Sequence, residues 1–235
     1  MKEQRQKVIL TCEHGGNDIP EEYAYLFEGA QEDLASPAGY DLGAQEIMDL
    51  LAPTADFTLV STVSRLLVDL NRTEHHPRLF SEYLRNVPPG IKRKILYEHY
   101  FSYRLKVEQQ IKAWAEAGET VYHLAVHTFN PYDDGKERNA DLGLLYDPSR
   151  EPEVLFTAKW RQQLESALPP LRIRYNYPKK GTADGMISLL RKQFTADQYV
   201  GLELEVNQSF FTEDVEGWKI LRPVLLETFR NTLQP

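Results

Sequence analysis

Short apolar runs alternate along the chain with longer segments whose apolar residues recur every three or four positions. The short runs have the length of buried strands, and the first, Val8-Ile9-Leu10, is rich in β-branched residues. They lie at 8–10, 57–61, 66–70, 120–126, 142–146, 171–175 and 199–206. Strands that alternate with helices indicate an α/β protein with a mixed or largely parallel sheet.

The longest helical pattern covers 91–114, where apolar and aromatic residues form one stripe and charges fill the other faces. We expect this helix to end near Gly118. Shorter helices are predicted at 21–28, from Tyr40 to Pro53, from Ser149 to Ser166, at 186–192 and at the end of the chain, where Pro223 kinks a helix or starts a new one. The segments 73–89, 133–138 and 176–185 are predicted loops. No repeat or linker divides the chain, so we expect one domain over 1–235.

The composition narrows the classes of partner. The formal net charge of −8 argues against a general binder of nucleic acid or anionic membranes, since both need a basic surface. Cys12 is the only cysteine, which excludes an intrachain disulfide and fits a cytoplasmic protein. The charged segment 1–7 is followed by no long apolar region, so neither a secretory signal nor a membrane span is predicted.

Polar side chains stand where several predicted strands end. Glu13-His14-Gly15-Gly16 follows the first strand, and glycines there allow a ligand to approach the backbone closely. Asp69-Leu70-Asn71-Arg72, His127 and Glu205 stand at the ends of three others. Ligands of open α/β sheets collect beyond the carboxyl ends of strands, so these side chains are candidates for one site.

Two histidines and a carboxylate are a common set of zinc ligands, and a further carboxylate then serves as a base. Arginines beside such a site bind a substrate carboxylate through two hydrogen bonds. The other histidines have simpler interpretations. His75, His76 and His99 are predicted surface residues, and His123 is predicted to be a hydrogen-bonded histidine of the core.

Seven motifs occur in the order that is typical of a known family. They are Glu13-His14-Gly15-Gly16-Asn17, Asp41 followed by Gly43, Ser64-Arg65, Asp69-Leu70-Asn71-Arg72, His127-Thr128, the stretch 138–145 and the stretch 203–208. Over about 8–210 the chain resembles the N-formylglutamate amidohydrolase family, which is distantly similar to aspartoacylase and the zinc carboxypeptidases. The resemblance implies a three-layer α/β/α fold around a mixed, largely parallel sheet, of the phosphorylase/hydrolase-like and zinc-carboxypeptidase-like kind.

The resemblance also implies roles for individual residues. His14 and His127 match the two histidine ligands of the metal, and Glu205 matches the carboxylate that activates water. Asn71 and Arg72 match the pair that binds the substrate carboxylate. Two further candidates lie in the shared motifs: Arg65, as a second cation that stabilises the oxyanion, and Arg138, as a substrate-binding residue.

The third metal ligand departs from the pattern of aspartoacylase and the carboxypeptidases. There a glutamate three residues after the first histidine is a ligand, but this chain has Asn17, a poor zinc ligand. Asp41 is the replacement candidate and Glu13 the second choice, while Asp41 equally fits a helix N-cap. Glu203 and Glu205 point to one face of a strand, and Glu203, which lies deeper, is expected to orient a histidine or an arginine.

The sequence therefore predicts a zinc-dependent amidohydrolase that cleaves a small N-acyl amino acid, such as N-formylglutamate, to formate and glutamate. One alternative is a carboxypeptidase-like or aspartoacylase-like hydrolase of another acyl or peptidyl substrate. The other is a non-catalytic protein that binds a carboxylate through Arg65 and Arg72, which Asn17 favours.

Overall fold

The computed structural model describes residues 5–234 and is built around one six-stranded sheet. The strands follow the order β2 (Phe57–Val60), β1 (Gln6–Cys12), β3 (Thr120–Phe129), β8 (Tyr199–Asn207), β6 (Leu142–Leu145) and β7 (Ile173–Tyr175). Strands β2, β1, β3 and β8 are parallel, whereas β6 is antiparallel to β8 and parallel to β7. The carboxyl ends of four strands and the amino end of β6 therefore share one edge.

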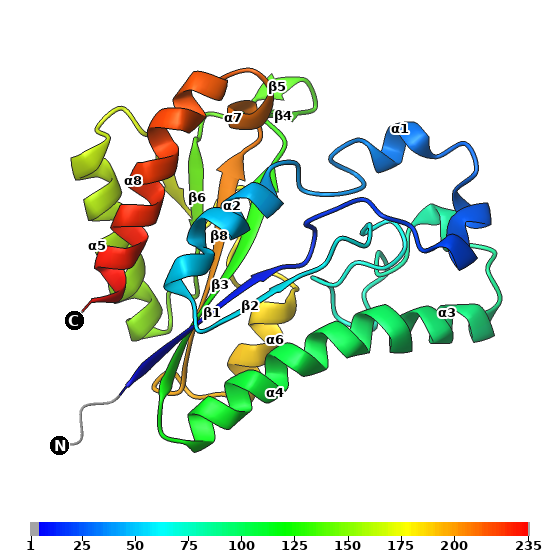
Figure 1. Ribbon diagram of the computed structural model, residues 1–235, viewed down its shortest axis with the longest axis horizontal. Coiled ribbons are helices and arrows are strands. Elements are labelled where there is room, and N and C mark those ends of the chain that lie inside the picture. The colour runs from blue at the N-terminus through cyan, green and yellow to red at the C-terminus, as the bar shows by residue number, and fades with distance from the viewer. Residues whose placement is uncertain (1–4, 235) are drawn as a thin grey trace.

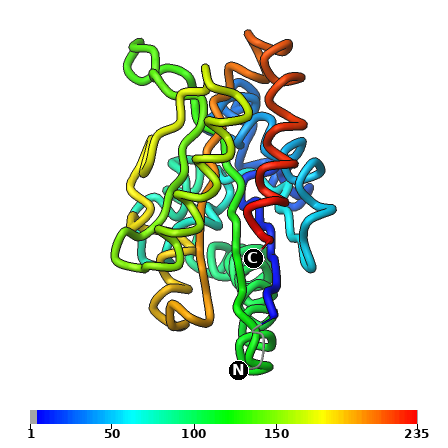
Figure 2. The backbone as a smooth tube through the Cα atoms, turned by 90° about the vertical axis from the view of Figure 1, so that its left-hand side faces the viewer, coloured from blue at the N-terminus to red at the C-terminus, as the bar shows by residue number. Residues whose placement is uncertain are grey.

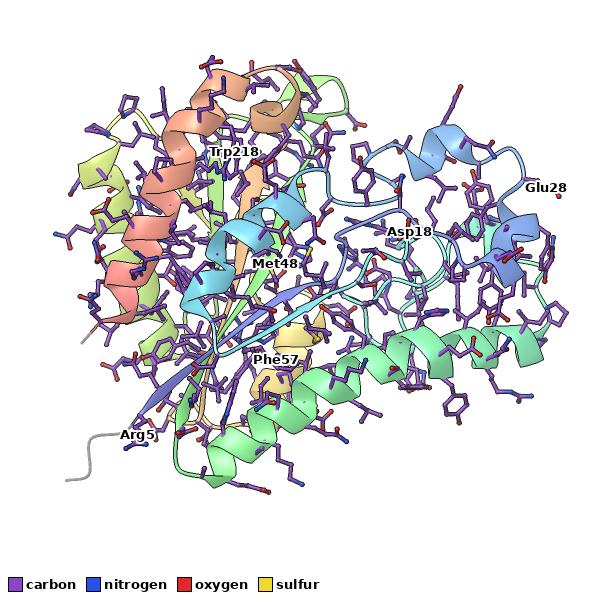
Figure 3. The ribbon with its side chains drawn as sticks, in the orientation of Figure 1. Arg5, Asp18, Glu28, Met48, Phe57 and Trp218 are labelled. Carbon is purple, nitrogen blue, oxygen red and sulfur yellow. The ribbon has the colours of Figure 1, made fainter. Side chains whose placement is uncertain are left out.

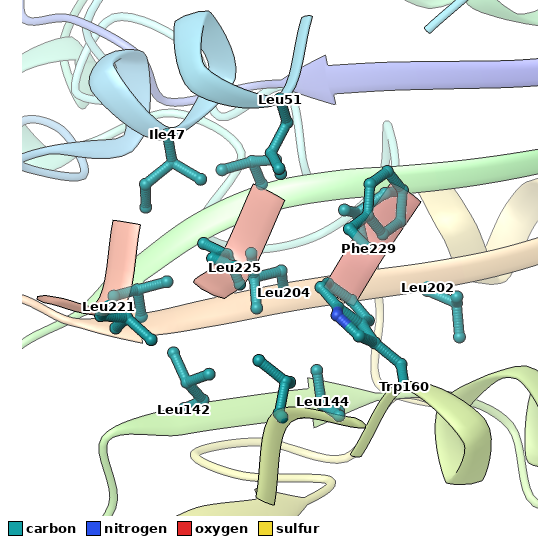
Figure 4. Close-up of a cluster of buried hydrophobic side chains, with 14 of the residues drawn as sticks. Ile47, Leu51, Leu142, Leu144, Trp160, Leu202, Leu204, Leu221, Leu225 and Phe229 are labelled. Atoms are coloured by element: carbon teal, nitrogen blue, oxygen red, sulfur yellow. The ribbon is translucent and has the colours of Figure 1, made fainter. Parts of the chain in front are cut away.

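Helices cover both faces of this sheet (Figures 1 and 2). One face carries α2 (Ala44–Leu51), α5 (Glu151–Ala167) and α8 (Val215–Leu233), whose apolar side chains form a core with alternate residues of the strands (Figure 4). The indole of Trp218, labelled in Figure 3, donates a hydrogen bond to Glu46 and so ties α8 to α2.

The other face is covered by a long helical segment and by α6 (Met186–Gln193). The long segment joins α3 (Pro89–Ile95), a π-helical turn (Leu96–Phe101) and α4 (Ser102–Glu116). Short elements complete the chain: 3₁₀ helices Glu21–Phe27, Ala52–Thr54 and Glu82–Leu84, helices α1 (Gln31–Leu34) and α7 (Ser209–Thr212), and a hairpin of β4 (Tyr132–Asp133) and β5 (Lys136–Glu137).

The predicted fold class, a mixed and mostly parallel sheet between helical layers, is confirmed. The predicted strand at 66–70 is wrong. Residues 67–70 are buried, but the N–H of Asp69 donates to the carbonyl of Leu79 in a neighbouring loop and not to a strand. The apolar side chains of this segment pack in the core on the side of the sheet that α4 and α6 cover. The apolar run therefore reflects burial and not a strand.

Three smaller predictions become more specific. The helix expected at 21–28 is a 3₁₀ helix, the loop expected at 133–138 overlaps the β4–β5 hairpin, and α8 continues through Pro223, which therefore does not start a new helix. Within residues 5–234 no helix has the length and apolar content that a membrane crossing requires. Part of the charged segment 1–7, residues 1–4, lies outside the described residues.

Candidate metal centre and active site

His14, Asp41 and His127 meet at the edge where the parallel strands end. All three are buried, and their ligand atoms lie within 4.8 Å of one another. His14 follows β1, and its carbonyl accepts a hydrogen bond of 2.9 Å from the N–H of Asp41, which fixes the segment before α2. The side chain of Asp41 does not cap α2, because the N-cap is Gly43 and no side chain caps that helix. Asp41 is therefore available to the site.

The Nδ1 atoms of both histidines face the carboxylate of Asp41. Nδ1 of His127 lies 2.8 Å from Oδ2 of Asp41, and Nδ1 of His14 lies 3.4 Å from the same oxygen. Within residues 5–234, Nδ1 of His14 is buried and has no hydrogen-bond partner. A buried nitrogen without a partner is costly, so this atom is free to coordinate a ligand.

The Nε2 atoms of the two rings each face another carboxylate. Nε2 of His14 lies 2.7 Å from Oδ1 of Asp69, and Nε2 of His127 lies 3.2 Å from Oε2 of Glu13. A histidine that binds a metal through one nitrogen commonly donates the other N–H to a carboxylate, which fixes the ring. Asp69 occupies this orienting position for His14, whereas Nε2 of His127 faces both Glu13 and the amide nitrogen of Asn71.

Buried carboxylates and cations shift one another's pKa at this point. Burial alone raises a carboxyl pKa, but Arg65 and the two histidines hold the pKa of Asp41 well below its usual value. The hydrogen bond and charge of His127 likewise lower the pKa of Glu13 to about 2. Burial lowers the pKa of His127, yet Asp41 and Glu13 outweigh it and raise the value to about 10. Two imidazoles and a carboxylate this close together are compatible with a metal ion.

The cavity beside this group has a volume of about 340 Å³ and contains the other predicted site residues: Arg65, Asn71, Arg72, Arg138 and Glu205. The guanidinium of Arg65 contacts Oδ1 of Asp41, and Nε of Arg72 lies 3.4 Å from Oδ2 of Asp69. The amide nitrogen of Asn71 lies 3.1 Å from Nε2 of His127, and its amide oxygen accepts a hydrogen bond from the N–H of Met186. Arg138 comes from the segment that precedes β6 and pairs with Asp133 at 3.3 Å.

Glu203 and Glu205 point to the face of β8 that carries this cavity, while Leu204 and Val206 enter the opposite core. Both glutamates are buried, and Glu205 is the one that lines the cavity. Burial raises the pKa of Glu205 above its ordinary value, although Lys179 and His127 oppose that change. The pKa of Glu203 is lowered because the charges of Lys179 and His127 outweigh burial.

Lys179 is a site residue that sequence reasoning missed. Its Nζ lies 2.8 Å from Oε2 of Glu203 and 3.8 Å from Oε1 of Glu205, and it lines the cavity. Burial lowers the pKa of Lys179, but the charges of both glutamates outweigh it and raise the pKa. The lysine therefore balances part of the negative charge on β8.

Two features of the backbone bring Lys179 to the site. Asn176 has a positive φ of 52° and reverses the chain after β7, and its side chain accepts hydrogen bonds from the N–H groups of Tyr146 and Gly181. The returning chain then passes over Gly143, where an added Cβ would lie 1.8 Å from the carbonyl oxygen of Tyr177. Only a residue without a side chain permits this path.

Two expectations at the first strand end differ from the structure. Glu13, the second choice for the third ligand, lies on the Nε2 side of His127 and not in the group of three ligands. Asn17, which the sequence predicts to be a poor ligand, lies outside that group, and its amide donates to the carbonyl of Leu34. Gly15 and Gly16 permit close contact with chain segment 60–62 and not with a ligand, since the N–H of Gly15 donates to the carbonyl of Ser61.

Comparison with solved structures supports the fold. A crystal structure of a gene product from Agrobacterium tumefaciens matches with a TM-score of 0.79 and 23% identity, over 97% of this chain and 90% of that one. An N-formylglutamate amidohydrolase from Ralstonia eutropha matches with a TM-score of 0.67 and 16% identity, over 98% of this chain and 94% of that one.

A search of curated proteins finds no match. The family model of N-formylglutamate amidohydrolase, in contrast, matches residues 6–212. This span contains all the residues of the candidate site and all the motifs that carry the resemblance. The chain therefore belongs to the N-formylglutamate amidohydrolase family.

Proposed function

We propose that the protein is a zinc-dependent amidohydrolase of small N-acyl amino acids, with N-formylglutamate as the first substrate to test. The observation that carries this proposal is the approach of two Nδ1 atoms, from His14 and His127, to the carboxylate of Asp41 beside a cavity that Glu205 lines. Catalytic zinc sites typically offer three protein ligands of these types and leave one position open.

His14, Asp41 and His127 would hold the ion. When bound, zinc supplies Lewis-acid chemistry: it polarises a carbonyl and lowers the pKa of water toward neutrality. The chain's own contribution is the proton transfer. Glu205 accepts a proton from the attacking water and passes it to the leaving amine, and a raised carboxyl pKa suits that exchange. Arg65, with its guanidinium at the edge of the group, stabilises negative charge on the former carbonyl oxygen.

The cationic residues of the cavity suit a substrate with carboxylates. Arg72 and Arg138 present guanidinium groups, which bind carboxylates through two parallel hydrogen bonds. Asn71 lies between His127 and the amino end of α6, and these two contacts fix its amide in the wall of the cavity. A glutamate with a short acyl group offers carboxylates for both arginines.

Asn17 would favour a non-catalytic binder if the site lacked a third ligand. Because Asp41 supplies that carboxylate and Asn17 lies outside the group, this argument does not hold. We therefore propose no second function.

The test is a hydrolysis screen over N-formyl, N-acetyl and short peptidyl amino acids, after chelation and after the return of zinc. We expect about one zinc per chain, formate release from N-formylglutamate, loss of activity on chelation and its recovery with zinc. The proposal fails if purified protein holds no zinc and added zinc produces no hydrolysis of any substrate in the screen.

A further inference from the structure

A second, larger cavity of about 910 Å³ lies next to the cavity of the metal centre. Arg65, Asp69 and Arg72 line both cavities. The segment that carries Arg72, the proposed substrate-binding arginine, therefore forms the boundary between them. The remaining wall comes from residues 74–85, in the chain between β2 and α3 (Figure 1), and from the start of the long helix. Cavities of this size typically hold a small molecule.

The wall of this second cavity is held in place by buried contacts. Leu79 and Leu84 anchor it in the core, and the carbonyl of Leu79 accepts a hydrogen bond from Asp69. The guanidinium of Arg104 donates to the carbonyls of Leu70 and Arg72, at 3.0 and 2.8 Å. A ligand therefore meets a formed cavity and does not have to order a loose loop.

The side chains that line this cavity carry a net positive charge, whereas the chain as a whole is negative. The formal net charge is −8, yet five cationic side chains and only three carboxylates line the cavity. Arg65 and Arg72 have carboxylate neighbours in Asp41 and Asp69. The other three cations of the lining have no carboxylate within 4.0 Å among the described residues: Arg78, Arg85 and Lys92.

We propose that this cavity binds an acidic extension of the substrate. The substrate is then an N-acyl amino acid with at least one carboxylate beyond the part held at the metal centre, and Arg78 and Arg85 bind that carboxylate. The inference rests on the proposed function, because Arg72 links the two cavities only if it faces the substrate. The metal-centre cavity is large enough for N-formylglutamate, so that compound leaves the larger cavity empty.

The first arm of the test uses turnover by the zinc-loaded enzyme. One pair probes an extension of the substrate side chain. Its acidic member is N-formyl-γ-glutamylglutamate, and its neutral member is the same compound with both terminal carboxylates converted to amides. The other pair probes an extension of the acyl group. Its acidic member is N-glutarylglutamate, and its neutral member is N-butyrylglutamate. In one of the two pairs the acidic member should have a kcat/KM about tenfold higher, as charge-assisted pairs at an accessible site provide.

The matched variants are Arg78→Gln/Arg85→Gln and, as a control, Arg93→Gln/Lys106→Gln, which removes two exposed cations outside both cavities. The first should remove the preference for the acidic member and leave turnover of N-formylglutamate unchanged. The control should keep the preference. Equal turnover of acidic and neutral members in both pairs overturns this inference and leaves the proposed function standing.

The second arm measures binding of γ-glutamylglutamate by calorimetry, with and without zinc, and does not depend on hydrolysis. Binding that weakens about tenfold in Arg78→Gln/Arg85→Gln and not in the control supports the cavity, even if no substrate is hydrolysed. Such binding without hydrolysis of any substrate would overturn the proposed hydrolase function and leave the binding cavity standing. Identical binding by both variants, together with equal turnover of N-glutarylglutamate and N-butyrylglutamate, would overturn the acidic subsite.

Discussion

His123 and His127 lie on the same strand, point to the same face of the sheet and are both buried, with 0% and 2% of their surface exposed. His123 sits in the middle of β3, where its ring nitrogens each lie 2.8 Å from a hydroxyl, of Thr11 and Tyr199. His127 sits at the carboxyl end, between Asp41 and Glu13.

The two surroundings drive the protonation of the rings in opposite directions. Burial lowers the pKa of His123 to about 4, which keeps it neutral in the core. Carboxylates overcome the same burial at His127 and raise its pKa to about 10. The comparison teaches that depth alone does not identify a functional histidine. The carboxylates beside the ring, here Asp41 and Glu13, distinguish His127 from His123.

The largest expected effect comes from replacing His123 and His127 one at a time. His127→Gln removes a proposed ligand, so we expect the zinc content to fall from about one ion per chain to almost none, with loss of activity. His123→Gln should keep zinc and activity and cost roughly 1–3 kcal/mol of stability, because it disturbs buried hydrogen bonds. Metal analysis and urea unfolding of both variants provide the check. Zinc loss in His123→Gln alone would reverse the two roles.

The same distinction applies to the adjacent strand, where Glu203 pairs with β3 at Ala125 and Glu205 pairs with it at His127. Glu205→Gln should retain fold and zinc but lower kcat by roughly 10²–10⁴, the usual share of a general acid–base group. Glu203→Gln removes the nearest carboxylate of Lys179, so it should weaken stability or zinc binding. Turnover and zinc content are measured side by side. Near-normal turnover in Glu205→Gln, with activity lost in Glu203→Gln at full zinc occupancy, would contradict the assignment.

The smallest effect concerns the pH dependence of stability. The folded pKa of His123, about 4, lies below the unfolded value of 6.5, so the folded state disfavours the charged ring. The stability that this residue contributes is fully present above pH 6.5 and is lost as the pH falls toward 4. Between pH 7 and pH 5 the loss is roughly 2 kcal/mol. His123→Gln should unfold with a correspondingly weaker pH dependence, and an unchanged one would argue that the ring is protonated in the fold.

Much of the fold follows from local patterns. The predicted strands at 8–10, 120–126, 142–146 and 199–206 all lie within observed strands or overlap them, since buried strands of a parallel sheet are continuous apolar runs. The stretch 66–70 has the same composition but is an irregular segment. Its hydrogen-bond partners lie in distant loops, and no local pattern specifies them.

The candidate site divides in the same way. His14, His127 and Glu205 follow or end strands, so the rule that ligands gather at strand ends is enough to group them from the sequence. Asp41 stands in a loop before a helix, and only the family resemblance singles it out. Lys179 carries no signal in the sequence, because its place depends on a chain reversal at Asn176 and on the space left at Gly143.

The close approach of Tyr177 to Gly143 has a consequence for the interpretation of variants of this protein. An alanine there would force the carbonyl of Tyr177 away from β6 and carry Lys179 off the glutamates of β8. A survey that scores variants by activity alone would then rank Gly143 with the residues that touch substrate. Gly143 acts only by leaving room for the carbonyl of Tyr177, and the loss of activity would come from the displacement of Lys179.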